Sequence, residues 1–168
     1  MSSCPLPLMI GIGNPLRRDD GVGWRLAAEW GLLQGDQAPA RVLAVQQVLP
    51  ELAETIARHD RVLFIDATCP GSRSRAEAAE ADPIIDGPSL QALRPDPTAA
   101  GAGVFSHSLD PAVLLALAAE LYGHSPKAHR LLLIGRRMTH GTTFSAVLRR
   151  QLPAARLLLR QWLEHGDA

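Results

Sequence analysis

Short, unbroken apolar runs that alternate with segments of helical periodicity constrain the fold of this chain more than any other feature of its sequence. RVLFI at 61–65 and HRLLLIG at 129–135 are typical of strands that are buried on both faces of a sheet. Leu6–Ile12 and Arg41–Val48 are also strand-like. The core is therefore expected to form around a β-sheet.

Helices are predicted between these strands. Apolar residues recur at near-helical spacing over Val22–Leu33 and over Leu49–Ile56, and Pro50 lies near the start of the second segment, where proline is tolerated. Strands that alternate with helices indicate a mainly parallel sheet with helices on both faces. The predicted fold class is thus α/β, a three-layer α/β/α sandwich around a mainly parallel twisted sheet.

Two further helices are predicted in the second half of the chain. The first begins with Asp110 as N-cap and Pro111 in the first turn, and Gly123 ends it. The second runs through the tail from Phe144 onward, and Pro153 is expected to kink or split it. Between them and the earlier strands, residues 70–103 are predicted to hold a short strand at 76–85 followed by a loop.

Length and charge limit the function classes. The 168 residues suit one domain over 1–168, and 17 basic against 17 acidic side chains argue against a nucleic-acid partner. No apolar run is long enough to cross a membrane, and the N-terminal MSSCPLPLMIGIG lacks the basic leader of a signal peptide. We therefore expect a cytoplasmic protein with neither a membrane nor a nucleic-acid partner.

Polar residues with metal-binding chemistry follow the predicted strands. In parallel α/β sheets the working site lies at the carboxyl ends of the strands. Asp20 and Asp66 follow the first and third strands, and His107 lies in a Gly-rich connection nearby. Two carboxylates and an imidazole suit a borderline divalent ion such as zinc or nickel.

Each of these residues also has a simpler interpretation. Asp20 could cap the helix that follows it, Asp66 could form a turn, and His107 could fill a loop.

The glycine-rich stretch GIGNPLRRDDGVG at 11–23 resembles a phosphate-binding loop only in part. A dinucleotide fingerprint requires a third glycine at position 16, where this chain has leucine. Asp19 and Asp20 would also repel a pyrophosphate at the start of the helix. The glycines are instead expected to form a tight turn, stabilised by the amide of Asn14, that projects the acids. Stabilisation by NAD or ATP, and not by nickel, would favour a nucleotide-binding domain instead.

Three motifs in this order resemble the hydrogenase maturation proteases, the endopeptidases that trim the C-terminal extension of the large subunit of nickel–iron hydrogenases. They are GIGNPLRRDDGVG at 11–23, DATCPG at 66–71 and SHSLDPAVLLALAAELYG at 106–123. The resemblance extends from about Leu8 to about Leu148, and TTFSAVLRRQLP at 142–153 is similar to the start of the family's last helix.

This resemblance implies a substrate, a metal and a set of site residues. The partner is a hydrogenase large-subunit precursor, cleaved only after nickel has been inserted, so the nickel comes with the substrate; another divalent metal in the resting protein is left open. The family's metal-contacting residues fall on Asp20, Asp66 and His107, which are the predicted metal and catalytic residues. Either Asp20 or Asp66 would serve as general base if a metal-bound water is the nucleophile.

The chain also departs from the family. Many relatives carry Glu at the position of Asp20, and the Gln-Pro-Glu-like stretch that often follows the last strand is replaced by GRRMTHG at 135–141. Arg17, Arg18, Arg136 and Arg137 either attract an acidic part of the precursor or form a solvated rim. A non-catalytic chaperone for the nickel-loaded precursor is the alternative function. The presence of all three predicted site residues favours the enzyme.

Overall fold

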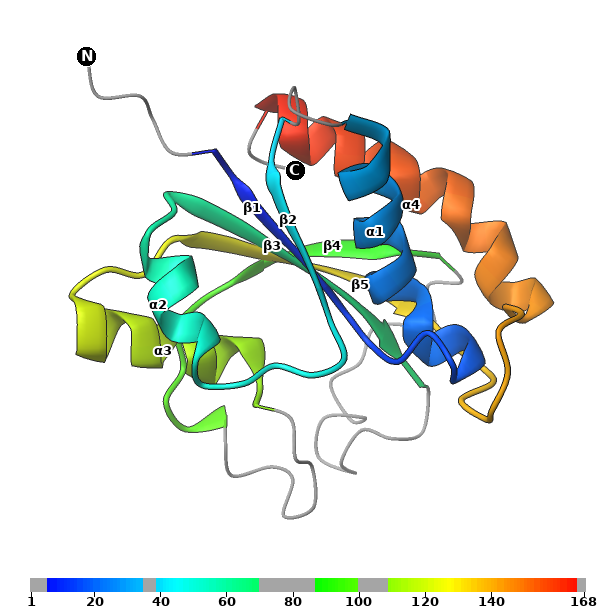
Figure 1. Cartoon of the computed structure of the whole chain (residues 1–168), viewed down its shortest axis with the longest axis horizontal. Coiled ribbons are helices and arrows are strands. Elements are labelled where there is room, and N and C mark those ends of the chain that lie inside the picture. Colours follow the sequence, from blue (N-terminus) through cyan, green and yellow to red (C-terminus); the bar gives the residue numbers. More distant parts are fainter. Residues whose placement is uncertain (1–5, 35–38, 70–86, 100–108, 166–168) are drawn as a thin grey trace.

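A computed structural model describes residues 6–34, 39–69, 87–99 and 109–165 of the chain (Figure 1). The described strands form one sheet in the order β2-β1-β3-β5-β4. Four of them are mutually parallel, and the edge strand β4 runs antiparallel to β5. The strands are β1 (Leu8–Ile12), β2 (Arg41–Val45), β3 (Arg61–Thr68), β4 (Ser89–Leu93) and β5 (Lys127–Ile134).

The helices cover both faces of this sheet. On one face, α1 (Val22–Gln34) and α4 (Ala146–His165) pack against side chains such as Met9 and Leu131. On the other face, α2 (Leu52–Ala57) and α3 (Pro111–Tyr122) pack against side chains such as Ile10 and Phe64. The predicted α/β/α sandwich is therefore confirmed.

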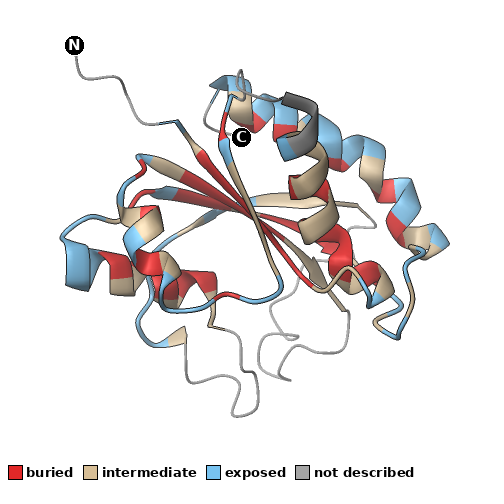
Figure 2. Ribbon diagram, in the orientation of Figure 1, coloured by how far each residue is buried: buried red, intermediate tan, exposed pale blue. Residues whose placement is uncertain are grey.

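The three central strands carry the core. All five residues of β1 are buried, as are Val62–Ile65 of β3, which pair in register with β1 and with β5 (Figure 2). The buried residues of β1 and β3 are apolar on both faces of the sheet because helices cover both faces. This burial explains why the short apolar runs are visible in the sequence.

Several predicted boundaries differ from the structure. β3 continues beyond Ile65 to Thr68, so Asp66 lies within the strand instead of after it. The segment expected to be a loop after residue 85 contains the edge strand β4, while the strand predicted at 76–85 lies outside the described residues. α4 passes through Pro153 without a break, so the helix is not split.

The predicted ends of α3 are confirmed. The Asp110 carboxylate accepts a 2.7 Å hydrogen bond from the Ala112 N–H, and Pro111 occupies the first helical position. Gly123 ends the helix with φ 70°, in the left-handed region that glycine adopts without strain.

Candidate active site at the carboxyl edge of the sheet

Glycines allow the chain to leave β1 in a tight turn. Gly13 has φ 127°, and its N–H donates to the carbonyl of Val45 at the end of β2. The side-chain oxygen of Asn14 accepts the N–H of Leu16 at 2.9 Å, which confirms the predicted role of its amide. The turn leads into a short 3-10 helix, η1 (Arg18–Gly21), that carries both acids.

The start of α1 lies directly on the backbone of the sheet. A Cβ atom on Gly23 would overlap the carbonyl oxygens of Ile12 and Ile65, the latter one residue before Asp66. Only glycine permits this approach. The close contact brings the η1 turn, with Asp20, beside the end of β3.

Asp19 is fully buried and acts as an anchor for a distant loop. One oxygen of its carboxylate accepts the N–H groups of Arg136 and Arg137 at 2.8 and 2.9 Å. The other oxygen accepts the N–H of Ser145 at 2.7 Å. Burial by itself raises the pKa of Asp19, but these hydrogen bonds outweigh it and hold the pKa below its usual range.

Arg17 and Arg18 hold the same two loops together. Their Nε atoms donate to the carbonyl oxygens of Met138 and His140, at 3.2 and 3.1 Å. The backbone of Arg18 has φ 48° and donates to the carbonyl of Gly141. These two side chains therefore contribute to loop structure, which the sequence did not indicate.

Asp20 is partly exposed, unlike its neighbour Asp19. Its Oδ2 accepts the N–H of Asn14 at 3.1 Å, a residue that precedes it in the turn. This bond closes the loop after β1. The carboxylate therefore contacts a residue that precedes it in the chain, and this contact differs from the helix cap that was the simpler interpretation of Asp20.

Asp66 projects from β3 on the face that α2 and α3 cover, because it lies two residues after the core residue Phe64. Its side chain is 22% exposed, and its Oδ1 accepts the N–H of Ala67 at 2.8 Å. Burial raises the pKa of Asp66, and the negative charge of Asp20 raises it further, against the lowering influence of Arg130. Asp20 and Asp66 therefore lie close enough to interact electrostatically.

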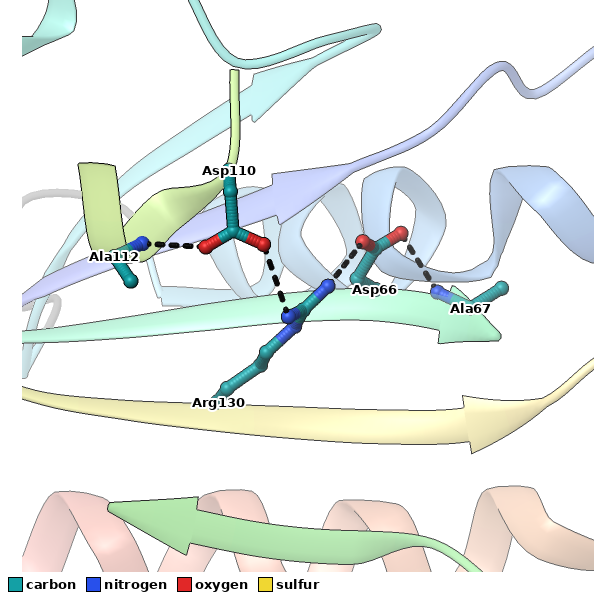
Figure 3. Close-up of polar contacts among 5 residues, drawn as sticks. All are labelled: Asp66, Ala67, Asp110, Ala112 and Arg130. Atoms are coloured by element: carbon teal, nitrogen blue, oxygen red, sulfur yellow. Dashed lines mark hydrogen bonds and ion pairs between the residues drawn. The ribbon is translucent and has the colours of Figure 1, made fainter. Parts of the chain in front are cut away.

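Asp66 and Asp110 share Arg130 of β5 as an ionic partner. The Asp66 carboxylate lies 3.4 Å from one guanidinium nitrogen, and the Asp110 carboxylate lies 3.7 Å from the other (Figure 3). Sequence reasoning missed Arg130. The signal was present as a single cation inside the apolar run HRLLLIG.

His107 lies outside the described residues, so its part in the site remains a prediction. Leu109, two positions further along the chain, donates its N–H to the carbonyl of Val48, in the loop after β2. Among the residues that the structure describes, no three His, Cys, Asp or Glu side chains form a metal-binding group. Asp20 and Asp66 are the two described members of the predicted set.

The fold and the site together define a class: an α/β/α sandwich protein with an acidic site at the carboxyl ends of its parallel strands. No protein-family model matches the sequence, and a search of curated proteins finds no match. Solved structures do match. The predicted resemblance is confirmed at the level of the fold, which is that of the hydrogenase maturation proteases.

The similarity covers nearly the whole chain. The NiFe-hydrogenase maturation protease HycI from Thermococcus kodakarensis matches 98% of this chain and 96% of its own, with a TM-score of 0.64 and 19% identity. The hydrogenase maturating endopeptidase HybD from E. coli matches 95% of this chain and 93% of its own, with a TM-score of 0.61 and 18% identity. HybD from T. kodakarensis matches 94% of this chain and 98% of its own, with a TM-score of 0.60 and 18% identity.

In the part of the chain described here, no helix combines the length and apolarity that a bilayer crossing requires.

Proposed function

We propose that this chain is a cytoplasmic endopeptidase that removes the C-terminal extension of a nickel-loaded NiFe-hydrogenase large-subunit precursor. The observation that carries the proposal is the packing of the η1 turn, which carries Asp20, against the end of β3, which carries Asp66, in a chain with the fold of HycI and HybD. Asp20 lies in the η1 turn and Asp66 lies near the end of β3, two segments that meet only after folding. HycI and HybD are named as a maturation protease and a maturating endopeptidase, and these names support peptidase activity for this chain.

In this proposal, the nickel of the precursor is recognised by Asp20, Asp66 and His107. Two carboxylates held close together repel each other, and a cation between them removes that repulsion. Asp20 and Asp66 interact in this unfavourable sense, because the charge of Asp20 raises the pKa of Asp66. The pair therefore suits a metal that the substrate supplies, and a divalent metal in the resting protein would use the same residues.

The chemistry is hydrolysis of one peptide bond. A water oxygen bonds to the scissile carbonyl carbon, the C–N bond breaks, and the proton that the water loses reaches the amine that leaves. A general base is most effective when its pKa lies near the working pH. The raised pKa of Asp66 supports it as the base over Asp19, whose pKa is lowered and whose carboxylate is occupied by backbone donors.

The test is the mass of a nickel-loaded large-subunit precursor before and after incubation with the protein. We expect the loss of a C-terminal peptide with wild type and none with Asp66→Asn, Asp20→Asn or His107→Ala. Nickel-free precursor should stay intact. Asp60→Asn is the matched control, because Asp60 immediately precedes β3 at the opposite end from Asp66. This control should cleave as wild type does.

Two results would contradict the proposal. An unchanged precursor that co-elutes with the wild-type protein would favour the alternative, a chaperone that binds the nickel-loaded precursor without cutting it. Equal cleavage of nickel-loaded and nickel-free precursor would show that the enzyme does not recognise nickel.

A further inference from the structure

Arg130 is a cation in an otherwise apolar part of the sheet. It lies on β5 opposite Phe64 of β3, and the guanidinium lies beside the carboxylates of Asp66 and Asp110 (Figure 3). The arginine side chain is 25% exposed. A charge that is largely removed from water requires charged or hydrogen-bonding partners. Here those partners are the two carboxylates.

Two of the three guanidinium nitrogens of Arg130 have partners among the described residues. Both of its ion pairs use terminal nitrogens, and within the described residues the buried Nε has no hydrogen-bond partner. The charged partners of Arg130 in the described part of the chain are the two carboxylates, one of which belongs to the candidate site.

The guanidinium occupies the position of a cation at Asp66. Asp66 Oδ2 faces Arg130, and Oδ1 already accepts the Ala67 N–H. A free divalent ion that binds Asp66 must therefore share a carboxylate oxygen with a positive charge beside it. The divalent ion and the guanidinium of Arg130 would both lie next to the same carboxylate. Two positive charges so close together, in a site partly shielded from water, repel each other strongly.

We propose that Arg130 is a specificity residue that disfavours free divalent ions at Asp66, so that the site accepts a metal only when a bound precursor presents it. This inference rests on the proposed function, because it takes Asp66 as a metal contact. It assigns to Arg130 a role that hydrolysis alone does not require.

The physical advantage lies in weak contact with the metal. A site with high affinity for free nickel would compete for the ion with the precursor's own ligands. The precursor would also contact the protein through its own residues. These contacts would hold the precursor's metal at the site even when the site has only a low affinity for the free ion. Arg130 lowers that affinity and leaves Asp20 and Asp66 able to detect the charge of a loaded precursor.

The test is isothermal titration of the full-length protein with Ni²⁺. Arg130→Met and Arg130→Gln remove the charge, and glutamine retains an N–H donor for Asp66, which favours folding. We expect both to bind Ni²⁺ at least about tenfold more tightly than wild type, because a repelling charge is removed. Arg130→Lys retains the charge and should stay within about threefold of wild type.

Controls separate this effect from general changes in the protein. Arg156→Met removes an arginine that pairs with Glu29 on the surface, 3.0 Å away, and should leave Ni²⁺ affinity unchanged. Adding Asp66→Asn to each neutral variant should abolish the gain in affinity. Circular dichroism and thermal unfolding identify any variant that fails to fold.

Two outcomes would overturn the inference. Neutral variants that bind Ni²⁺ no more tightly than wild type would exclude a repelling role for Arg130, even if wild type cleaves the precursor. A gain that survives Asp66→Asn would show that the additional metal binds elsewhere. Cleavage of nickel-loaded precursor by wild type is a separate measurement, so its absence would refute the proposed function and leave the Ni²⁺ result to be read independently.

Discussion

The carboxylate of Asp19 accepts a 2.7 Å hydrogen bond from the backbone N–H of Ser145, 126 residues further along the chain. Its other oxygen accepts two more backbone N–H groups, from Arg136 and Arg137. One buried side chain thus joins the connection after β1 to the connection after β5. Asp20 depends on this anchor for its position, because it is the next residue of the same turn.

Asp19→Asn is expected to destabilise the protein by about 2–4 kcal/mol, because an amide NH₂ would face backbone donors that need an acceptor. The measurement is the urea midpoint, with an unchanged slope. Asp20→Asn is the matched control, since Asp20 is partly exposed and accepts one backbone hydrogen bond. Its cost should stay below about 1 kcal/mol. Equal losses for the two variants would contradict the anchoring role of Asp19.

Asp19 should also contribute to acid unfolding. Its pKa is lower in the folded state than in the unfolded chain, so the ionised carboxylate stabilises the protein above the unfolded pKa, and this contribution is lost as the pH falls through the folded value. We expect the stability of wild type to fall steeply below about pH 4. Asp19→Asn should show a shallower fall in urea unfolding between pH 5 and 3. Parallel curves would show that other carboxylates dominate.

Gly23 and Gly31 lie on the same helix and should respond in opposite directions to alanine. A Cβ on Gly23 would overlap the carbonyl oxygens of Ile12 and Ile65, so Gly23→Ala should cost more than about 3 kcal/mol. On Gly31, the Cβ would meet Val42 at an ordinary 3.6 Å, and Gly31→Ala should stabilise the protein by about 0.5–1 kcal/mol. Thermal unfolding measures both. A neutral Gly23→Ala would contradict the close packing of α1 on the sheet.

His59 should make the protein less stable in mild acid. Burial lowers its pKa, as does the charge of Arg41, against the raising effect of Asp60. Neither ring nitrogen has a hydrogen-bond partner among the described residues. Below the unfolded pKa of about 6.5 the unfolded chain takes up a proton that the folded protein does not, so stability falls as the pH falls.

The check is His59→Phe, which removes the titrating ring. Its gain in stability over wild type should be larger at pH 5 than at pH 8, measured by urea unfolding at both values. The substitution would keep the contact between the His59 carbonyl oxygen and Nε2 of His124, which lie 3.1 Å apart, because it changes only the side chain. A gain independent of pH would mean that the ring does not titrate differently on folding.

The four arginines of the two joined loops should divide into two pairs. Arg136 and Arg137 are exposed, and charge reversal of both is expected to weaken precursor binding at low salt while stability changes by less than about 0.5 kcal/mol. Reversal of Arg17 and Arg18 should lower stability as well, because their Nε donors hold the loop at Met138 and His140. Precursor binding at two salt concentrations, with urea unfolding alongside, tests this. If charge reversal of Arg136 and Arg137 leaves precursor binding unchanged, these two residues form a solvated rim and do not attract the precursor.

The sequence predicted the sheet well where burial is uniform. β3 is apolar on both faces over Val62–Ile65 and β5 over Leu131–Ile134, and the cap at Asp110 depends only on neighbouring residues. β4 was missed because Ser89–Leu93 is a five-residue edge strand whose side chains are half-buried or exposed, so no apolar pattern marks it.

The site was harder to predict because it depends on distant contacts. Two adjacent acids were visible, but the burial of Asp19 follows from its contact with a loop more than 100 residues away. Arg130 is one of two cationic residues in β5, and only the register of β5 against β3 brings it to Asp66. His107 stays a prediction, since it lies outside the described residues.

Three main-chain N–H groups donate to the Asp19 carboxylate, and within the described residues the hydroxyl of Ser145 is the one side chain that adds to them. Any amino acid except proline can supply a main-chain donor at positions 136, 137 and 145. The attachment of this loop to Asp19 therefore depends little on its side chains apart from Ser145, and the rest of its sequence can diverge while its position is retained. Such a segment gives natural selection or protein engineering a place to change partner preference without disturbing the chemistry beside it.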